Sequence, residues 1–100
     1  MDAVTNPFEE RYRRSESMVS RRIAGEAVLV PIRNQVGTLD SIYALNETAA
    51  LVWETLDGEQ PLSQALARIT AEFEVDEAQA GRDLQVLIAD LARIGAVEKV

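Results

Sequence analysis

The sequence predicts an α+β domain in which a three-stranded antiparallel sheet precedes three helices. Apolar and polar residues alternate in short runs between positions 18 and 45, which is the period of a half-buried strand. Beyond position 45, apolar residues recur every three or four positions, which is the period of an amphipathic helix. A length of 100 residues, with 47% hydrophobic and 27% charged residues, is typical of one globular domain.

The first two strands are expected to form a hairpin in the run SMVSRRIAGEAVLVPIR. The pair Gly25–Glu26 is predicted as its two-residue turn, because glycine readily adopts the positive φ that such turns require. Pro31 cannot donate a ladder hydrogen bond, so it is expected at a bulge or where strand pairing has ended. Alternation assigns one face to Val19, Arg21 and Ile23 and another face to Val28, Val30 and Ile32.

A loop, NQVGTLD, leads to a third strand, SIYAL, which runs directly into the first helix. Tyr43 and Leu45 share one face of this strand. Asn46 is a favourable N-cap, and Gly58 is expected to end the helix in a left-handed conformation. Trp53 is expected in the core. The apolar stripe of the helix comprises Leu45, Ala49, Val52, Trp53 and Leu56.

The second and third helices are both marked at their starts. Pro61 suits the first turn of the second helix, and Asp76 with Gln79 forms a capping-box pattern at the start of the third. Gly95 is expected to end the third helix, after which AVEKV could return as a short strand. The apolar stripes are Leu62, Ala65, Leu66, Ile69 and Phe73 in the second helix, and Ala80, Leu84, Leu87, Ile88 and Leu91 in the third.

The chain is predicted to divide into a flexible N-terminal arm, residues 1–17, and a folded domain, residues 18–100. The arm has few large apolar side chains, and chain termini are commonly solvated. An alternative is that its basic residues contact an acidic partner; these are Arg11, Arg13 and Arg14.

Catalysis, metal binding and cofactor binding are not expected. The chain has neither cysteine nor histidine, which removes thiolate and imidazole ligands and the commonest general base. No glycine-rich phosphate loop is present, and the carboxylates lack the spacing of a calcium loop. No apolar run approaches the ~20 residues of a membrane helix and no signal-peptide pattern is present, so a cytoplasmic location away from membranes is expected by default.

A small sheet beside three helices is the anatomy of a winged helix, which commonly binds DNA. The net charge of −7 opposes this use, because an acidic surface repels phosphate. The third helix is itself acidic, although a helix in the major groove should present basic or amide side chains. Nucleic acid is therefore not an expected partner. A regulatory or protein-interaction module stays open as an alternative function for a domain of this anatomy. The charged residues compared in this helix are Asp76, Glu77, Asp83 and Asp90 against Arg82 and Arg93.

The SIYAL strand is expected at the edge of the sheet, beside a helix. An edge strand has unpaired N–H and C=O groups, to which a peptide can add as a further strand. The groove between the strand and the helix would then hold the peptide. The alternative is that the N-terminal arm covers this edge.

Two segments taken together resemble the PqqD family, whose members are standalone forms of the recognition element for ribosomally synthesised and modified peptides (RiPPs). The segment LNETAALVWETLDG matches the first part of the family pattern, at Leu45, Asn46, Ala49, Trp53, Asp57 and Gly58. The segment DLQVLIADLARIGAVEKV matches the second part, at Asp83, Leu84, Leu87, Ile88, Leu91, Gly95, Ala96 and Val97. The resemblance covers about residues 18–100.

The resemblance implies a non-catalytic peptide chaperone that binds the leader of a precursor peptide by strand addition. The chaperone would deliver the peptide to a modifying enzyme, commonly a radical SAM enzyme, in pyrroloquinoline quinone (PQQ) biosynthesis or in another peptide-maturation system. The implied peptide-binding residues are Ser41, Ile42, Tyr43 and Ala44 on the strand and Asp83, Val86, Leu87 and Asp90 on the helix. Asp83 and Asp90 share a helix face, where they either meet basic leader side chains or remain solvated. A monomer or a weak homodimer is expected.

Overall fold

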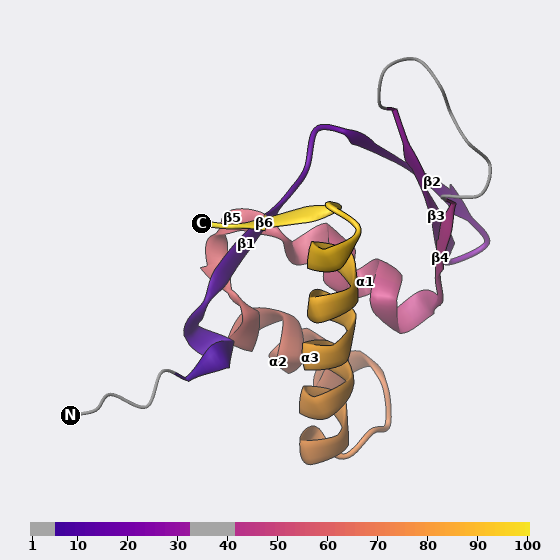
Figure 1. Cartoon of the computed structure of the whole chain (residues 1–100). Coiled ribbons are helices and arrows are strands. Elements are labelled where there is room, and N and C mark those ends of the chain that lie inside the picture. Colours follow the sequence, from indigo (N-terminus) through magenta and orange to yellow (C-terminus); the bar gives the residue numbers. More distant parts are fainter. Residues whose placement is uncertain (1–5, 33–41) are drawn as a thin grey trace.

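The computed structural model describes residues 6–32 and 42–100, and Figure 1 shows its helices and strands. The described elements, in chain order, are a short 3-10 helix η1 (Pro7–Glu9), β1 (Arg11–Arg14), β2 (Met18–Ile23), β3 (Glu26–Pro31), β4 (Tyr43–Leu45), α1 (Glu47–Thr55), β5 (Asp57–Pro61), α2 (Leu62–Glu72), α3 (Glu77–Arg93) and β6 (Val97–Lys99). The predicted α+β class is confirmed. The predicted sheet is β2-β3-β4, and a second antiparallel sheet, β5-β1-β6, adds to it. The expected loop NQVGTLD lies outside the described residues.

The β2-β3 hairpin forms as expected, but its turn lies one residue earlier than predicted. Ile23 pairs with Glu26, so Ala24 and Gly25 make the turn, with φ of 52° and 87°. A two-residue turn of this kind needs positive φ at both positions, and Glu26 instead begins β3. Pro31 is the last residue of β3 but still pairs with Met18, and Ile32 donates to Ser17 one position further on, so the pairing has not ended there as predicted. Its missing N–H costs no bond to β2, because at this position the backbone groups of β3 point away from β2.

The register also corrects the predicted faces of the hairpin. Val19 lies opposite Val30, and Arg21 lies opposite Val28. Directly paired residues of an antiparallel sheet project from the same face, so the two predicted sets share one face rather than occupying two. The face turned toward the core comes from the intervening residues of β3, because Leu29 and Ala27 are both buried.

α1 and α3 start where their capping residues predict, whereas α2 begins at Leu62, so Pro61 lies just before its first turn, as the N-cap and the last residue of β5. Asn46 Oδ1 accepts a hydrogen bond from the backbone N–H of Ala49 (2.8 Å), and Asp76 accepts one from Gln79 (3.2 Å). α1 ends at Thr55, earlier than predicted, and Gly58 lies within β5 with a φ of 83°. At the end of α3, Gly95 takes the expected left-handed conformation.

The N-terminal segment forms the middle strand of the second sheet, a strand that was not predicted from the sequence. β1 pairs with β5 on one side and with β6 on the other. Arg13 forms an ion pair with Glu98 (2.9 Å), and Arg14 donates hydrogen bonds to the last carbonyls of α1. Residues 7–14 are therefore part of the folded domain rather than of a flexible arm. The expected C-terminal strand is β6, which joins the same sheet.

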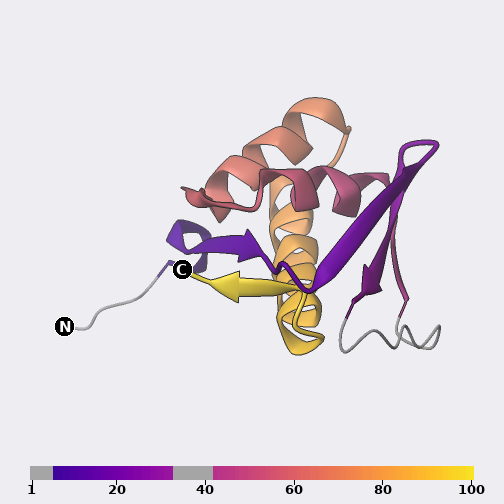
Figure 2. The same ribbon diagram turned by 90° about the horizontal axis from the view of Figure 1, so that it is seen from above.

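The two sheets lie on opposite sides of α3 in both ribbon views (Figures 1 and 2). α3 buries one stripe against the rest of the molecule, and Trp53 of α1 is buried as predicted. The buried residues of the α3 stripe are Ala80, Gly81, Leu84, Ile88 and Leu91. Within residues 6–32 and 42–100, no helix combines the length and apolar character needed to cross a membrane.

Candidate functional site

β4 is an edge strand of the hairpin sheet within the described part of the chain. It pairs antiparallel with β3, and the sheet order β2-β3-β4 leaves its other side without a strand. β1, which belongs to the predicted N-terminal arm, lies in the other sheet. The alternative that this part of the arm covers the β4 edge therefore does not apply to residues 6–17.

The hydrogen-bond phase of the sheet decides which backbone groups of β4 point away from β3. Opposed residues of an antiparallel pair alternate between exchanging hydrogen bonds and exchanging none. The N–H of Ile32 donates to the carbonyl of Ser17 (2.8 Å), which sets the phase of the β2-β3 ladder. Counting back along the register, Leu29 directs its backbone groups toward β4. Tyr43, which pairs with Leu29, therefore directs its N–H and C=O toward β3. The N–H and C=O of the next residue, Ala44, point the opposite way, outward from the sheet edge.

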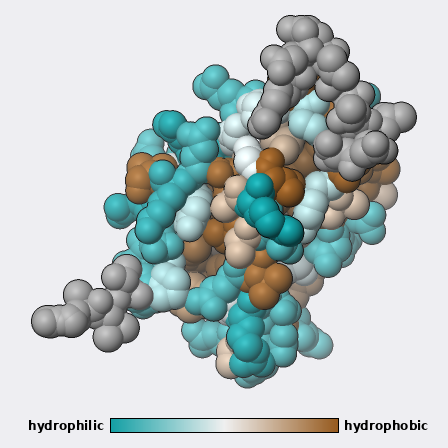
Figure 3. Space-filling view, viewed as in Figure 1, coloured by the Kyte–Doolittle hydropathy of each residue, from teal (hydrophilic) through white to brown (hydrophobic). Residues whose placement is uncertain are grey.

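A groove of about 360 Å³ runs between β4 and α3. Its volume is in the range of ligand-binding clefts. Figure 3 shows hydrophobic side chains along α3 within a surface that is otherwise mostly hydrophilic. The lining residues come from β4, from all three helices and from the connections beside them: Tyr43, Ala44, Leu45, Asn46, Thr48, Ala49, Val52, Ile69, Phe73, Val75, Ala80, Asp83, Leu84, Val86, Leu87 and Asp90.

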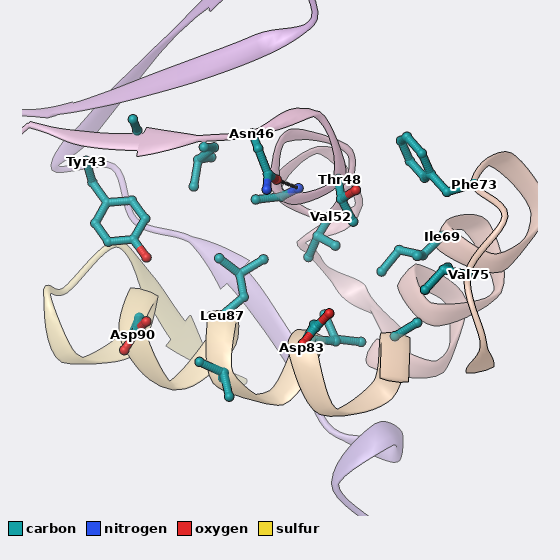
Figure 4. A pocket seen from close by; sticks show the side chains of 16 residues that line it. Tyr43, Asn46, Thr48, Val52, Ile69, Phe73, Val75, Asp83, Leu87 and Asp90 are labelled. Carbon is teal, nitrogen blue, oxygen red and sulfur yellow. Dashed lines mark hydrogen bonds between the residues drawn. The ribbon is translucent and has the colours of Figure 1, made fainter. Parts of the chain in front are cut away.

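The two ends of the groove differ in chemistry. At one end, Tyr43 projects from β4 toward Asp90 on α3 (Figure 4). At the other end, Ile69, Phe73 and Val75 form an apolar wall. Leu87 lies between the two ends and is half-buried. The groove can therefore hold an extended chain whose side chains meet a polar end and an apolar end.

Six of the eight residues implied by the resemblance line this groove together: Tyr43, Ala44, Asp83, Val86, Leu87 and Asp90. Ile42 precedes β4 and is 42% exposed, but it is not part of the lining. Ser41 lies outside the described residues. Leu84, predicted as core, is buried and also reaches the groove lining. Which of these residues contact a peptide stays a prediction.

The far wall of the groove was not predicted from the sequence. Phe73 and Ile69 belong to the stripe of α2, which was assigned to the core without any link to the strand. Val75 follows α2 in the connection to α3, and Thr48 and Val52 come from α1. No spacing rule relates these three helices to one groove, because only their packing brings the residues together.

The charged side chains in the lining are both acidic. Asp83 accepts a hydrogen bond from the Gln79 side chain (2.9 Å), and Asp90 forms an ion pair with Arg93 (2.8 Å). Tyr43 adds an aromatic ring and a hydroxyl to the polar end. In the described part of the chain, no cluster of three or more potential ligand side chains could hold a metal ion. The groove offers shape, backbone hydrogen bonds and negative charge.

Comparison with known proteins places the chain in a family. The family model "Coenzyme PQQ synthesis protein D (PqqD)" matches residues 26–97. The solved structure "TbiB1 in Complex with the TbiA(beta) Leader Peptide" is similar, with 24% identity, a TM-score of 0.71, and coverage of 86% of this chain and 94% of that chain. The structure "Lasso peptide synthetase B1 complexed with the leader peptide" is also similar, with 24% identity, a TM-score of 0.71, and coverage of 88% and 98%. No curated protein gives a match.

The two structural similarities, each with 24% identity, support the same fold across most of the chain. The family model spans the first segment of the resemblance and the second as far as Val97, from the start of β3 to the start of β6. The chain therefore belongs to the PqqD family.

Proposed function

We propose that this protein is a non-catalytic adaptor that binds the leader segment of a ribosomally synthesised precursor peptide and delivers it to a modifying enzyme. The observation that carries the proposal is the outward-facing backbone of Ala44 at the β4 edge, directly beside the groove. A peptide that adds there gains main-chain hydrogen bonds from the strand and side-chain contacts from α3.

The comparisons support a peptide as the occupant. Both similar structures are described as complexes with a leader peptide, and each covers more than four-fifths of this chain. The extended shape of a strand also suits a groove that runs between β4 and α3, because successive side chains alternate between the groove and the outer face of the sheet. In this proposal the leader becomes the fourth strand of the β2-β3-β4 sheet.

For the recipient, we propose a radical SAM enzyme, which is the partner that the resemblance to the PqqD family implies. The similarity to lasso peptide proteins makes a different peptide-modifying enzyme the alternative. PQQ biosynthesis and another peptide-maturation pathway are both compatible with the same groove. The adaptor itself would act in the cytoplasm, as a monomer or a weak homodimer.

The test is a backbone amide NMR titration of the full chain with a synthetic leader peptide, taken from a precursor gene that neighbours this one. Binding by strand addition shifts the amides of residues 43–46 and those of α3 around Leu87. Shifts confined to the other sheet, or unchanged spectra with every neighbouring leader, would contradict the proposal. Salt-dependent binding of duplex DNA in the same series would favour the winged-helix regulatory alternative instead.

A further inference from the structure

We propose that the groove selects a leader segment with basic side chains beside an apolar one, so that lysine or arginine meets α3. This inference rests on the proposed function and names the chemistry of the peptide that the groove accepts. It depends on the charges of the lining, the neighbours of each carboxylate, and the geometry of the strand and the helix.

The charge of the groove has one sign. Asp83 and Asp90 are the charged residues of the described lining, and both are acidic. The full chain carries a formal net charge of −7, which adds to the negative potential around the groove. An acidic leader would bring like charges together when it enters the groove, whereas a basic leader would be attracted to it.

The local partners leave this negative charge available. Asp83 is hydrogen-bonded by Gln79, a neutral amide, so its charge is not cancelled by that contact. Asp90 pairs with Arg93 three residues later on the same helix, and the Arg93 side chain is 69% exposed. Exposed ion pairs of this kind contribute little free energy and are easily exchanged, so a peptide cation can compete for Asp90.

The spacing of the carboxylates suits an extended peptide. Asp83 and Asp90 lie seven positions apart on α3, which corresponds to roughly 10 Å along the helix axis. Side chains on one face of a strand recur roughly every 7 Å, so flexible basic side chains two or four residues apart can reach both carboxylates. An apolar side chain further along would then lie against Phe73 and Ile69 at the other end of the groove.

The test is a selection from random peptides of about twelve residues displayed on phage, long enough for one added strand. Wild-type protein is the target, and each selected peptide is then synthesised and measured against three variants. The double variant Asp83→Asn/Asp90→Asn removes the groove charge, and Ala44→Pro blocks the strand edge. Glu59→Gln/Glu74→Gln changes the net charge equally at exposed positions outside the groove.

We expect peptides that depend on the β4 edge to be enriched in lysine and arginine. Their affinity should fall roughly 5- to 20-fold in Asp83→Asn/Asp90→Asn, from two exposed ion pairs, and should stay near wild type in Glu59→Gln/Glu74→Gln. The difference in affinity between wild type and Asp83→Asn/Asp90→Asn should shrink as the salt concentration rises from about 0.05 M to about 0.5 M, because ions screen exposed charges.

Two other outcomes separate this inference from the proposed function. In the first outcome, the selected peptides lose binding in Ala44→Pro, but they are not enriched in basic residues or they bind Asp83→Asn/Asp90→Asn as well as wild type. This outcome would overturn the charge selectivity and leave strand addition standing. Selected peptides that all bind Ala44→Pro as tightly as wild type would overturn strand addition at β4, and the selectivity with it.

Discussion

Replacing Ala44 by proline removes one backbone N–H from the β4 edge and so tests whether a peptide adds to this strand. The Ala44 N–H points away from β3, so its loss removes no ladder hydrogen bond of the hairpin sheet. Proline also favours an extended conformation for the residue before it, which Tyr43 already has as part of β4. The folded protein should therefore tolerate the change, whereas an added strand would lose a donor and meet the proline ring.

The expected magnitude follows from the hydrogen bonds lost. A peptide residue opposite Ala44 would exchange two backbone hydrogen bonds with it, and proline removes one of them. A net hydrogen bond contributes about 0.5–1.5 kcal/mol, and a peptide carbonyl left without a donor costs about 1–3 kcal/mol more. Taking about 2–3 kcal/mol for the sum, the dissociation constant should rise roughly 30- to 150-fold.

The assay is isothermal titration calorimetry with the leader peptide that gives the NMR shifts, alongside urea unfolding of each variant. Ala44→Val is the matched control, because valine keeps the N–H, favours strands and places its side chain on the outer face. We expect wild-type affinity for Ala44→Val and unfolding free energies within about 1 kcal/mol for both variants. A folded Ala44→Pro protein with unchanged affinity would refute strand addition at β4.

Three further predictions concern the scaffold. Deleting residues 1–14 removes the middle strand of β5-β1-β6, so urea unfolding should show a loss of several kcal/mol or no cooperative transition; a wild-type curve would show that β1 is dispensable. Asn46→Ala should lower the unfolding free energy by about 1 kcal/mol while Asn46→Asp keeps most of it, and equal effects would argue against a capping role. A hydrogen bond from Lys99 holds the pKa of Glu10 below its ordinary 4.5, and Glu10 raises the pKa of Lys99 above 10.5. The stabilisation from this pair should be lost as pH falls through the lowered Glu10 pKa or rises through the raised Lys99 pKa, and Lys99→Met should weaken both changes in the melting temperature.

The parts of the fold that depend on neighbouring residues could be predicted from the sequence. Alternation located the hairpin, and the capping residues Asn46 and Asp76 located the starts of α1 and α3. The strand-to-helix junction at Leu45–Asn46 was equally local, and it joins β4 directly to α1. The turn was misplaced by one residue because Ala24, which has no special signal for positive φ, shares it with Gly25.

Long-range pairing could not be predicted in the same way. The strand RYRR has no apolar alternation, and its two partners lie more than forty residues away in the sequence, so its place in the second sheet depends on tertiary contacts. The apolar end of the groove is similar, because Phe73 and Val75 reach it only through the packing of α2 against α3. The sequence by itself determined the hairpin, the strand that leads into α1 and the starts of α1 and α3, since periodicity and capping act over a few residues. Only the tertiary structure decided which elements enclose the groove, since that depends on contacts between segments far apart in the chain.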